Sequence, residues 1–87
     1  MKVGDFYKIG RKGIIYTGSL EKDVKQGEPL IVVHDNKQYS AFLWQIEQFS
    51  LGYITPDKAY KGQSVGLFFS YHVKLPESRD VMIYARD

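Results

Sequence analysis

One stretch of this chain indicates its class of fold: Gln63-Ser64-Val65-Gly66-Leu67-Phe68-Phe69-Ser70-Tyr71. Within it, the apolar side chains of Val65, Leu67 and Phe69 occupy every second position, so in an extended backbone they fall on one face. Alternation of this kind over about four to eight residues is typical of a half-buried β-strand. We therefore expect a strand at residues 63–71 with one face lining the protein core.

The rest of the chain is divided into similar short runs by eight glycines and three prolines. No segment carries apolar residues at helical spacing over about three turns, so a long amphipathic helix is excluded. Aromatic residues make up 15% of the chain and also favour strands. Further strands are predicted for Asp5–Ile9, Gly13–Leu20, Pro29–His34, Tyr39–Phe49 and Asp80–Ala85.

The segments between these runs predict turns and one short helix. Glu21–Gln26 is polar and is interpreted as a hairpin loop, and Asp35-Asn36 predicts a turn. Thr55 followed by Pro56 is typical of a helix start, because Thr can cap the first turn and Pro fits the first helical position. We therefore expect a short helix at Pro56–Tyr60.

Together these elements predict one all-β domain spanning residues 1–87: a closed or nearly closed, mostly antiparallel barrel of about six strands with one short helix. Further apolar residues, among them Leu43, Phe68 and several tyrosines, fall on a second face that a partner or a second copy could cover. The predicted interior comprises Ile15, Leu20, Leu30, Val32, Phe42, Trp44, Ile46, Val65, Leu67, Phe69, Val81 and Ile83.

Composition excludes several classes of function. There is no cysteine, hence no disulfide framework, thiolate metal site or cysteine nucleophile. His34 and His72 have no partner residues at metal-ligand spacing, and no serine–base arrangement is evident. We expect no catalysis, no metal and no cofactor. No apolar run approaches the roughly 20 residues of a membrane span and no signal-peptide pattern opens the chain, so a cytoplasmic protein without membrane contact is expected.

The second predicted strand contains the segment Gly13-Ile14-Ile15-Tyr16-Thr17-Gly18-Ser19-Leu20-Glu21, and three further short blocks follow it. This segment is similar to G-x-V-x-T-G-x-V-E, which opens domain 2 of the translation GTPases, such as elongation factor Tu. The blocks Val24–Glu28, Ile46–Phe49 and Ala59–Leu67 are similar to its I-K-V-G-D/E, V/I-E-x-F and A-x-x-G-x-x-V-G-L segments. They occur in family order from about residue 3 to residue 85, and the resemblance implies the β-barrel of that domain.

The nucleotide-binding motif G-x-x-x-x-G-K-[ST] of the translation GTPases is missing. The resemblance therefore implies the accessory barrel standing alone: a non-catalytic binding module that engages RNA or a protein through one barrel face. The alternative is a structural or assembly module that self-associates, as a homodimer, through exposed aromatic surface.

The resemblance also implies a site. In elongation factor Tu this barrel helps to hold the 3′ end of tRNA, and the glutamate of V/I-E-x-F, here Glu47, lines the pocket of the terminal adenosine. Gln45 lies on the same strand face, which we expect to be exposed. Arg11 and Lys12 form a basic stretch beside them, so the candidate surface for RNA or a partner is Arg11, Lys12, Gln45 and Glu47.

Other interpretations stay open for these residues. On the residue types alone, a solvated strand carboxylate is favoured for Glu47 and a solvated end of the chain for the basic stretch. The segment Gly10-Arg11-Lys12-Gly13 also matches the G-x-x-G loop of KH domains. Its neighbours are predicted strands instead of helices, which favours a basic hairpin turn.

Overall fold

The computed structural model describes residues 1–48, 52, 54–70 and 74–86, and no helix occurs among them. The predicted all-β class is confirmed. The described strands are β1 (Val3–Ile9), β2 (Gly13–Ser19), β3 (Val24–Lys25), β4 (Pro29–His34), β5 (Lys37–Phe42), β6 (Gln45–Glu47), β7 (Lys58–Ala59), β8 (Ser64–Ser70) and β9 (Met82–Ala85).

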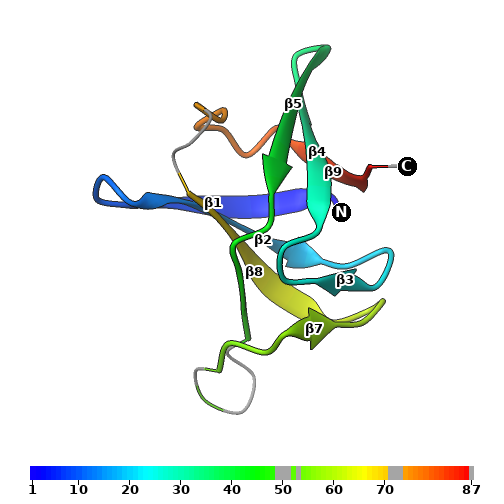
Figure 1. Cartoon of the computed structure of the whole chain (residues 1–87). Coiled ribbons are helices and arrows are strands. Elements are labelled where there is room, and N and C mark those ends of the chain that lie inside the picture. Colours follow the sequence, from blue (N-terminus) through cyan, green and yellow to red (C-terminus); the bar gives the residue numbers. More distant parts are fainter. Residues whose placement is uncertain (49–51, 53, 71–73, 87) are drawn as a thin grey trace.

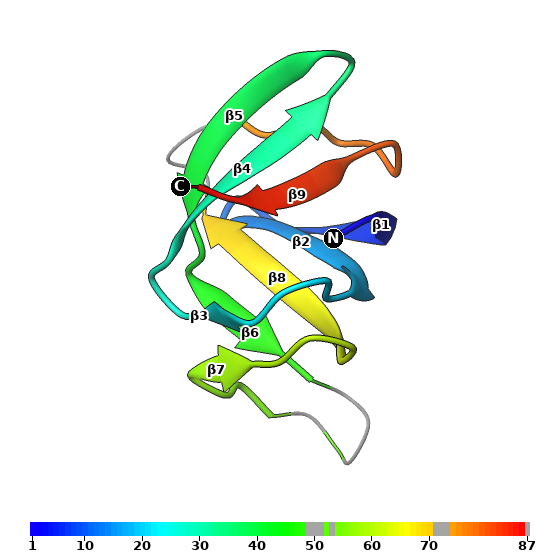
Figure 2. The ribbon, with the colours of Figure 1, turned by 90° about the vertical axis from the view of Figure 1, so that its right-hand side faces the viewer.

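All strand pairs are antiparallel and form three sheets within the described ranges (Figure 1). The largest has the order β1-β2-β8-β6, the second β5-β4-β9, and the third consists of β3 and β7. Figure 2 shows the β5-β4-β9 sheet at one end of the molecule and the β3-β7 pair at the other, with β1, β2 and β8 between them.

The predicted strands are close to the observed ones, with one division. Tyr39–Phe49 was expected as one strand, but the chain forms β5 and β6 with Leu43 and Trp44 between them. The ends of two predicted strands, Phe49 and Tyr71, lie outside the described residues.

The turn between β4 and β5 follows the sequence prediction. Asp35 and Asn36 have φ angles of 55° and 64°. Two consecutive residues with positive φ are what a tight β-hairpin requires, and Asp and Asn adopt this conformation more readily than most residues.

The predicted helix at Pro56–Tyr60 is wrong, as is the hairpin loop predicted to span Glu21–Gln26. Lys58–Ala59 forms β7, which pairs with β3, and the Gln26 N–H donates to the Asp57 carbonyl oxygen at 2.8 Å. Ala59 is fully buried in the core. This long-range pairing satisfies backbone groups and buries apolar surface, which outweighs the weak local preference for one helical turn.

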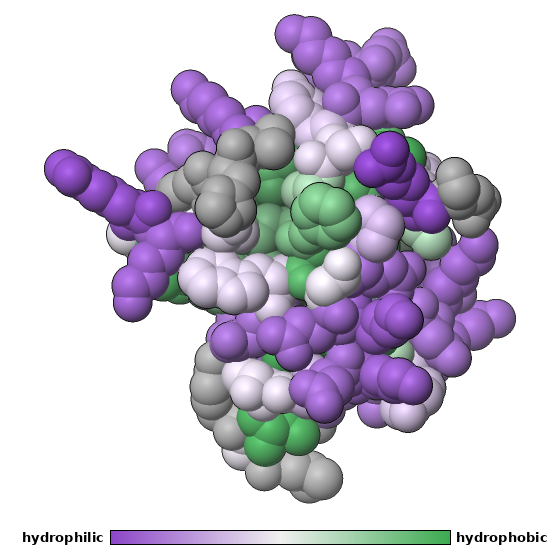
Figure 3. All heavy atoms as spheres, viewed as in Figure 1, coloured by the Kyte–Doolittle hydropathy of each residue, from purple (hydrophilic) through white to green (hydrophobic). Residues whose placement is uncertain are grey.

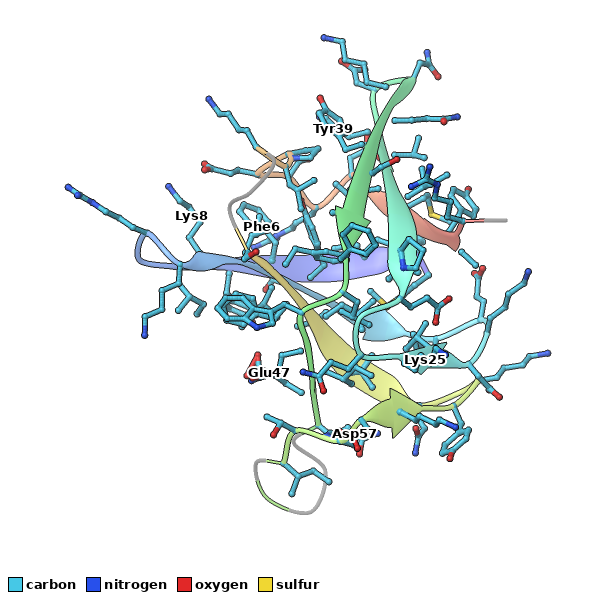
Figure 4. The ribbon with its side chains drawn as sticks, viewed as in Figure 1. Phe6, Lys8, Lys25, Tyr39, Glu47 and Asp57 are labelled. Atoms are coloured by element: carbon cyan, nitrogen blue, oxygen red, sulfur yellow. The ribbon has the colours of Figure 1, made fainter. Side chains whose placement is uncertain are left out.

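A single hydrophobic core fills the space between the sheets. The predicted interior positions Val65, Leu67, Phe69 and Ile46 are buried in it. The other buried members are Met1, Val3, Ile14, Tyr16, Leu20, Val24, Leu30, Val32, Leu43, Ala59, Leu75, Val81 and Ile83. Phe6 of β1 and Tyr39 of β5, labelled in Figure 4, pack against it.

Three predicted interior positions are wrong. Ile15 is buried but lies outside the core cluster, because Ile14 and Tyr16 of β2 take the core-facing positions. Phe42 and Trp44 are exposed, and Leu43 between them is buried instead. The two-residue break between β5 and β6 shifts the alternation, so the pattern read through it assigns the wrong face.

The closed barrel is not confirmed, because the strand pairs form separate sheets. Single backbone contacts nevertheless connect them. The N–H of Val3 donates to the carbonyl oxygen of Val81 at 3.1 Å, and that of Ile83 to Met1 at 2.8 Å. At the other side, the N–H of Trp44 donates to the carbonyl oxygen of Phe68 at 2.9 Å.

Candidate functional site

The outward face of the largest sheet carries one cross-strand row of large side chains. Tyr7 pairs with Ile15, Ile15 with Phe68, and Phe68 with Gln45. Directly opposed residues of neighbouring strands point to the same side of a sheet. Because the adjacent positions Tyr16, Leu67 and Ile46 are in the core, this row faces away from it. We call Tyr7, Ile15, Phe68 and Gln45 the outer row.

An exposed tryptophan is held against this row. The rings of Trp44 and Phe68 meet edge to face, with centroids 5.2 Å apart and an angle of 73° between planes. The backbone hydrogen bond from Trp44 to Phe68 fixes the main chain at the same point. Trp44 is still 51% exposed. A large aromatic ring is thus displayed to solvent in a restrained position.

A glycine makes room for this arrangement. A β-carbon on Gly13 would lie 2.7 Å from Cε1 of Phe68, well inside van der Waals contact. The Phe68 ring therefore lies over the bare backbone at the start of β2. Gly13 directly follows Arg11 and Lys12, so the aromatic pair lies close to the basic turn between β1 and β2.

Phe42 and Trp44 also line a groove of about 620 Å³. Ala41 and the buried Leu43 also line it, and the polar lining side chains are Gln26, Ser40 and Ser70; none of these residues is charged. Phe42 is 69% exposed. Figure 3 shows apolar and weakly polar side chains gathered at the centre of this face, over the lower end of β5, with hydrophilic side chains around them.

The basic turn lies at one end of the largest sheet. Arg11 and Lys12 are exposed, and the N–H of Lys12 donates to the Ile9 carbonyl oxygen at 2.8 Å, which closes the turn. Nearby, Lys8 forms an ion pair with Glu77 at 3.2 Å. Within the described part of the chain, neither Arg11 nor Lys12 takes part in an ion pair. Both cations are positioned to meet an external anion.

The structure brings the four predicted site residues onto one sheet but not into one cluster. Gln45 belongs to the outer row and is half-buried. β6 is separated from β2 by β8, a distance of about 10 Å, and Arg11 and Lys12 lie beyond the end of β2. Figure 4 shows Glu47 well apart from Lys8, which lies near the basic turn.

The expected exposure of Glu47 is wrong. Glu47 lies two residues after Gln45 on β6, so its side chain is on the same outward face of the sheet. It is nevertheless only 5% exposed. A carboxylate covered in this way presents no free acceptor at the surface for a ribose hydroxyl. The exposed side chains near Glu47 in the sequence are instead those of Phe42 and Trp44.

Sequence reasoning missed both aromatic residues because it assigned them to the core. An unbroken strand would place Phe42, Trp44 and Ile46 on one face, and Ile46 is indeed buried. No residue in this segment marks a break: it contains neither glycine nor proline. The local signal that usually indicates a bulge is therefore absent.

The pKa of the Asp5 carboxyl is lowered from its usual value of 3.8. The main cause is a hydrogen bond at 2.9 Å that the Phe6 N–H donates to the carboxylate; partial desolvation opposes it, and the nearby charge of Arg79 reinforces it. The Nε of Arg79 lies 3.1 Å from Asp5, which connects the segment before β9 to β1.

Because folding lowers this pKa, ionised Asp5 stabilises the fold at pH values above 3.8, and this contribution is lost as pH falls through the lowered value. We expect Asp5→Asn to reduce stability at neutral pH and to make the decline in thermal midpoint between pH 5 and pH 2 shallower than in the wild type. Calorimetry across that range measures both. A decline of unchanged steepness in Asp5→Asn contradicts the assignment.

Among the described residues, no group of three His, Asp or Glu could hold a metal ion. The Nδ1 of His34 lies 2.7 Å from the Asp80 carbonyl oxygen, a structural contact between β4 and the β9 region. His72 lies outside the described residues. No helix in the described part of the chain is long and apolar enough to cross a membrane.

Comparison with known proteins adds no relative. No protein-family model matches the chain, and no curated protein matches it. The resemblance to domain 2 of the translation GTPases therefore rests on the four sequence blocks.

Proposed function

We propose that the chain is a stand-alone, non-catalytic binding module resembling domain 2 of translation factors, and that it engages single-stranded RNA through the face that carries Trp44. The observation that carries this proposal is the restrained, half-exposed Trp44 against Phe68. The basic turn with Arg11 and Lys12 lies at the end of the same sheet. Proteins that bind single strands combine such aromatic platforms with basic residues that meet the phosphates.

The proposal includes a nearly closed barrel as the scaffold. Three features support it. The chain continues from β5 into β6, and the backbone of Trp44 bonds to β8. The N–H groups of Val3 and Ile83 donate to the carbonyl oxygens of Val81 and Met1, which connects the N-terminal segment to the segment around β9. With these contacts, the order of neighbouring strands around the barrel would be β5, β4, β9, β1, β2, β8 and β6, with β6 next to β5 again. A closed ring leaves few open strand edges and holds the aromatic face rigid.

Phosphate contacts by the basic turn predict a specific response to Arg11→Ala. The variant should bind oligoribonucleotides of every sequence more weakly, and the slope of log affinity against log salt concentration should fall by about one unit. Fluorescence anisotropy of labelled single-stranded RNA and of tRNA at several salt concentrations measures both quantities.

Lys22→Ala is the matched control. It removes one positive charge beyond the opposite end of β2 and leaves the overall charge equal to that of Arg11→Ala. Equal losses in the two variants would show a general charge effect and no site at the turn. Failure of the wild type to bind any RNA, with a concentration-dependent dimer in sedimentation, would favour the alternative of an assembly module that uses the same aromatic surface.

A further inference from the structure

The groove between Phe42 and Trp44 has the chemistry of a nucleobase site. Its walls include two exposed aromatic rings and the half-buried side chain of Ala41, with the buried Leu43 beneath them. A nucleobase is flat and uncharged, with apolar faces that stack on aromatic rings and a polar edge that forms hydrogen bonds. The groove of about 620 Å³ falls in the size range of small-ligand sites, roughly 300–1,000 Å³.

The polar groups of the groove match a base edge and not a phosphate. Gln26 carries both a donor and an acceptor, and the hydroxyls of Ser40 and Ser70 can each donate or accept. A phosphate or carboxylate would require a cation in the groove, and none of the described residues that line it is charged. The uncharged lining therefore selects the base part of a nucleotide.

The groove is also continuous with the basic turn. Ser70, which lines the groove, pairs with Gly13 in the β2–β8 ladder, and Gly13 directly follows Lys12. A strand with one base in the groove would pass Ser70 and bring its next phosphates toward Arg11 and Lys12. The groove for a base and the positive charges for the neighbouring phosphates thus follow one another along the path of a single strand.

We infer that the groove binds one unpaired nucleobase of the RNA, stacked on Trp44 and Phe42, with Gln26 at its polar edge. This inference rests on the proposed function and specifies how the same face would hold its ligand. It assigns base contact to the groove residues and phosphate contact to the turn.

Trp44 is the only tryptophan, so tryptophan fluorescence reports on this one side chain of the groove. The probes are a 12-nucleotide oligouridylate and a 12-unit abasic ribose-phosphate chain of the same charge. We expect oligouridylate to quench Trp44 and to bind about tenfold or more tightly than the abasic chain, which should leave the fluorescence unchanged.

Variants separate the two kinds of contact. Phe42→Ala should weaken binding of oligouridylate about tenfold and leave binding of the abasic chain unchanged, whereas Arg11→Ala should weaken both. Tyr84→Ala is the matched control, since Tyr84 of β9 is 47% exposed but does not line the groove. It should bind both probes like the wild type. Circular dichroism and thermal melting establish that each variant is folded.

The outcomes distinguish this inference from the proposed function. Salt-dependent binding of oligouridylate without quenching, and with Phe42→Ala equal to the wild type, would overturn the base site and leave RNA binding by the face intact. Binding of neither probe would overturn both. Equal affinity of the wild type for the two probes would likewise exclude a base in the groove.

Discussion

Leu67→Ala should lower the free energy of unfolding by about 2–5 kcal/mol, the usual cost of truncating a buried leucine. Leu67 lies on β8, between β2 and β6, where it is paired with Tyr16 and Ile46. All three side chains are completely buried. A shortened side chain leaves a cavity that three strands border and that the hydrogen-bonded sheet cannot collapse to fill.

The expected loss from Leu67→Ala is large compared with the total free energy of unfolding. A chain of 87 residues has an expected stability of roughly 4–13 kcal/mol, at about 0.05–0.15 kcal/mol per residue. Urea unfolding followed by circular dichroism measures the change as a lower midpoint at an unaltered slope.

Two variants of the same strand serve as controls. Leu67→Met nearly conserves volume and should cost less than about 1.5 kcal/mol, so it keeps the test informative if the alanine variant is largely unfolded. Ser64→Ala changes an exposed side chain of β8 and should stay within about 0.5 kcal/mol of the wild type. A Leu67→Ala effect as small as that of Ser64→Ala would mean that the register of β8 is wrong.

Gly13→Ala is the second large effect we expect, and its cause is steric. A β-carbon there would lie 2.1 Å from the carbonyl oxygen of Phe69 and 2.7 Å from the Phe68 ring. The oxygen belongs to the backbone of β8 and can move only if β2 and β8 separate. Overpacking typically costs about 1–3 kcal/mol, and a clash with backbone places this variant at the upper end.

Because the clash displaces Phe68, it should also disturb Trp44 and shift its emission maximum. Gly4→Ala is the matched control in the neighbouring strand: its β-carbon would lie 3.8 Å from the Thr17 carbonyl oxygen, an ordinary contact. It should be neutral or slightly stabilising, because alanine restricts the unfolded chain. A Gly13→Ala protein as stable as Gly4→Ala would contradict the close approach of β2 and β8.

The sequence predicts the strands well where a periodic pattern is uninterrupted. Val65, Leu67 and Phe69 alternate without a break, and β8 follows with these side chains in the core. The turn at Asp35-Asn36 is predicted for a similarly local reason, since both residues tolerate positive φ. The tight contact at Gly13 was not predicted, because a glycine alone does not show which neighbour approaches its backbone.

The candidate site was predicted only in part. The exposed basic turn at Arg11 and Lys12 follows from the residues themselves, because charged side chains in a short turn remain in water. Glu47 was expected at the surface and is buried, while Trp44 was expected in the core and is exposed. The four sequence blocks that resemble translation-factor domain 2 stay a prediction, as does the RNA ligand.

By itself, then, the sequence determined the all-β class, most strand positions and the basic turn, because alternation, turn preference and charge act between near neighbours. Only the tertiary structure decided the pairing of β3 with β7 and the change of face between Leu43 and Ile46. Both depend on contacts between segments distant in the sequence. Ala59 of β7 pairs with Val24 of β3, and the N–H of Trp44 donates a hydrogen bond to the carbonyl oxygen of Phe68. Such contacts bury apolar surface and satisfy backbone hydrogen bonds together, and these gains exceed the small local preferences that a sequence pattern expresses.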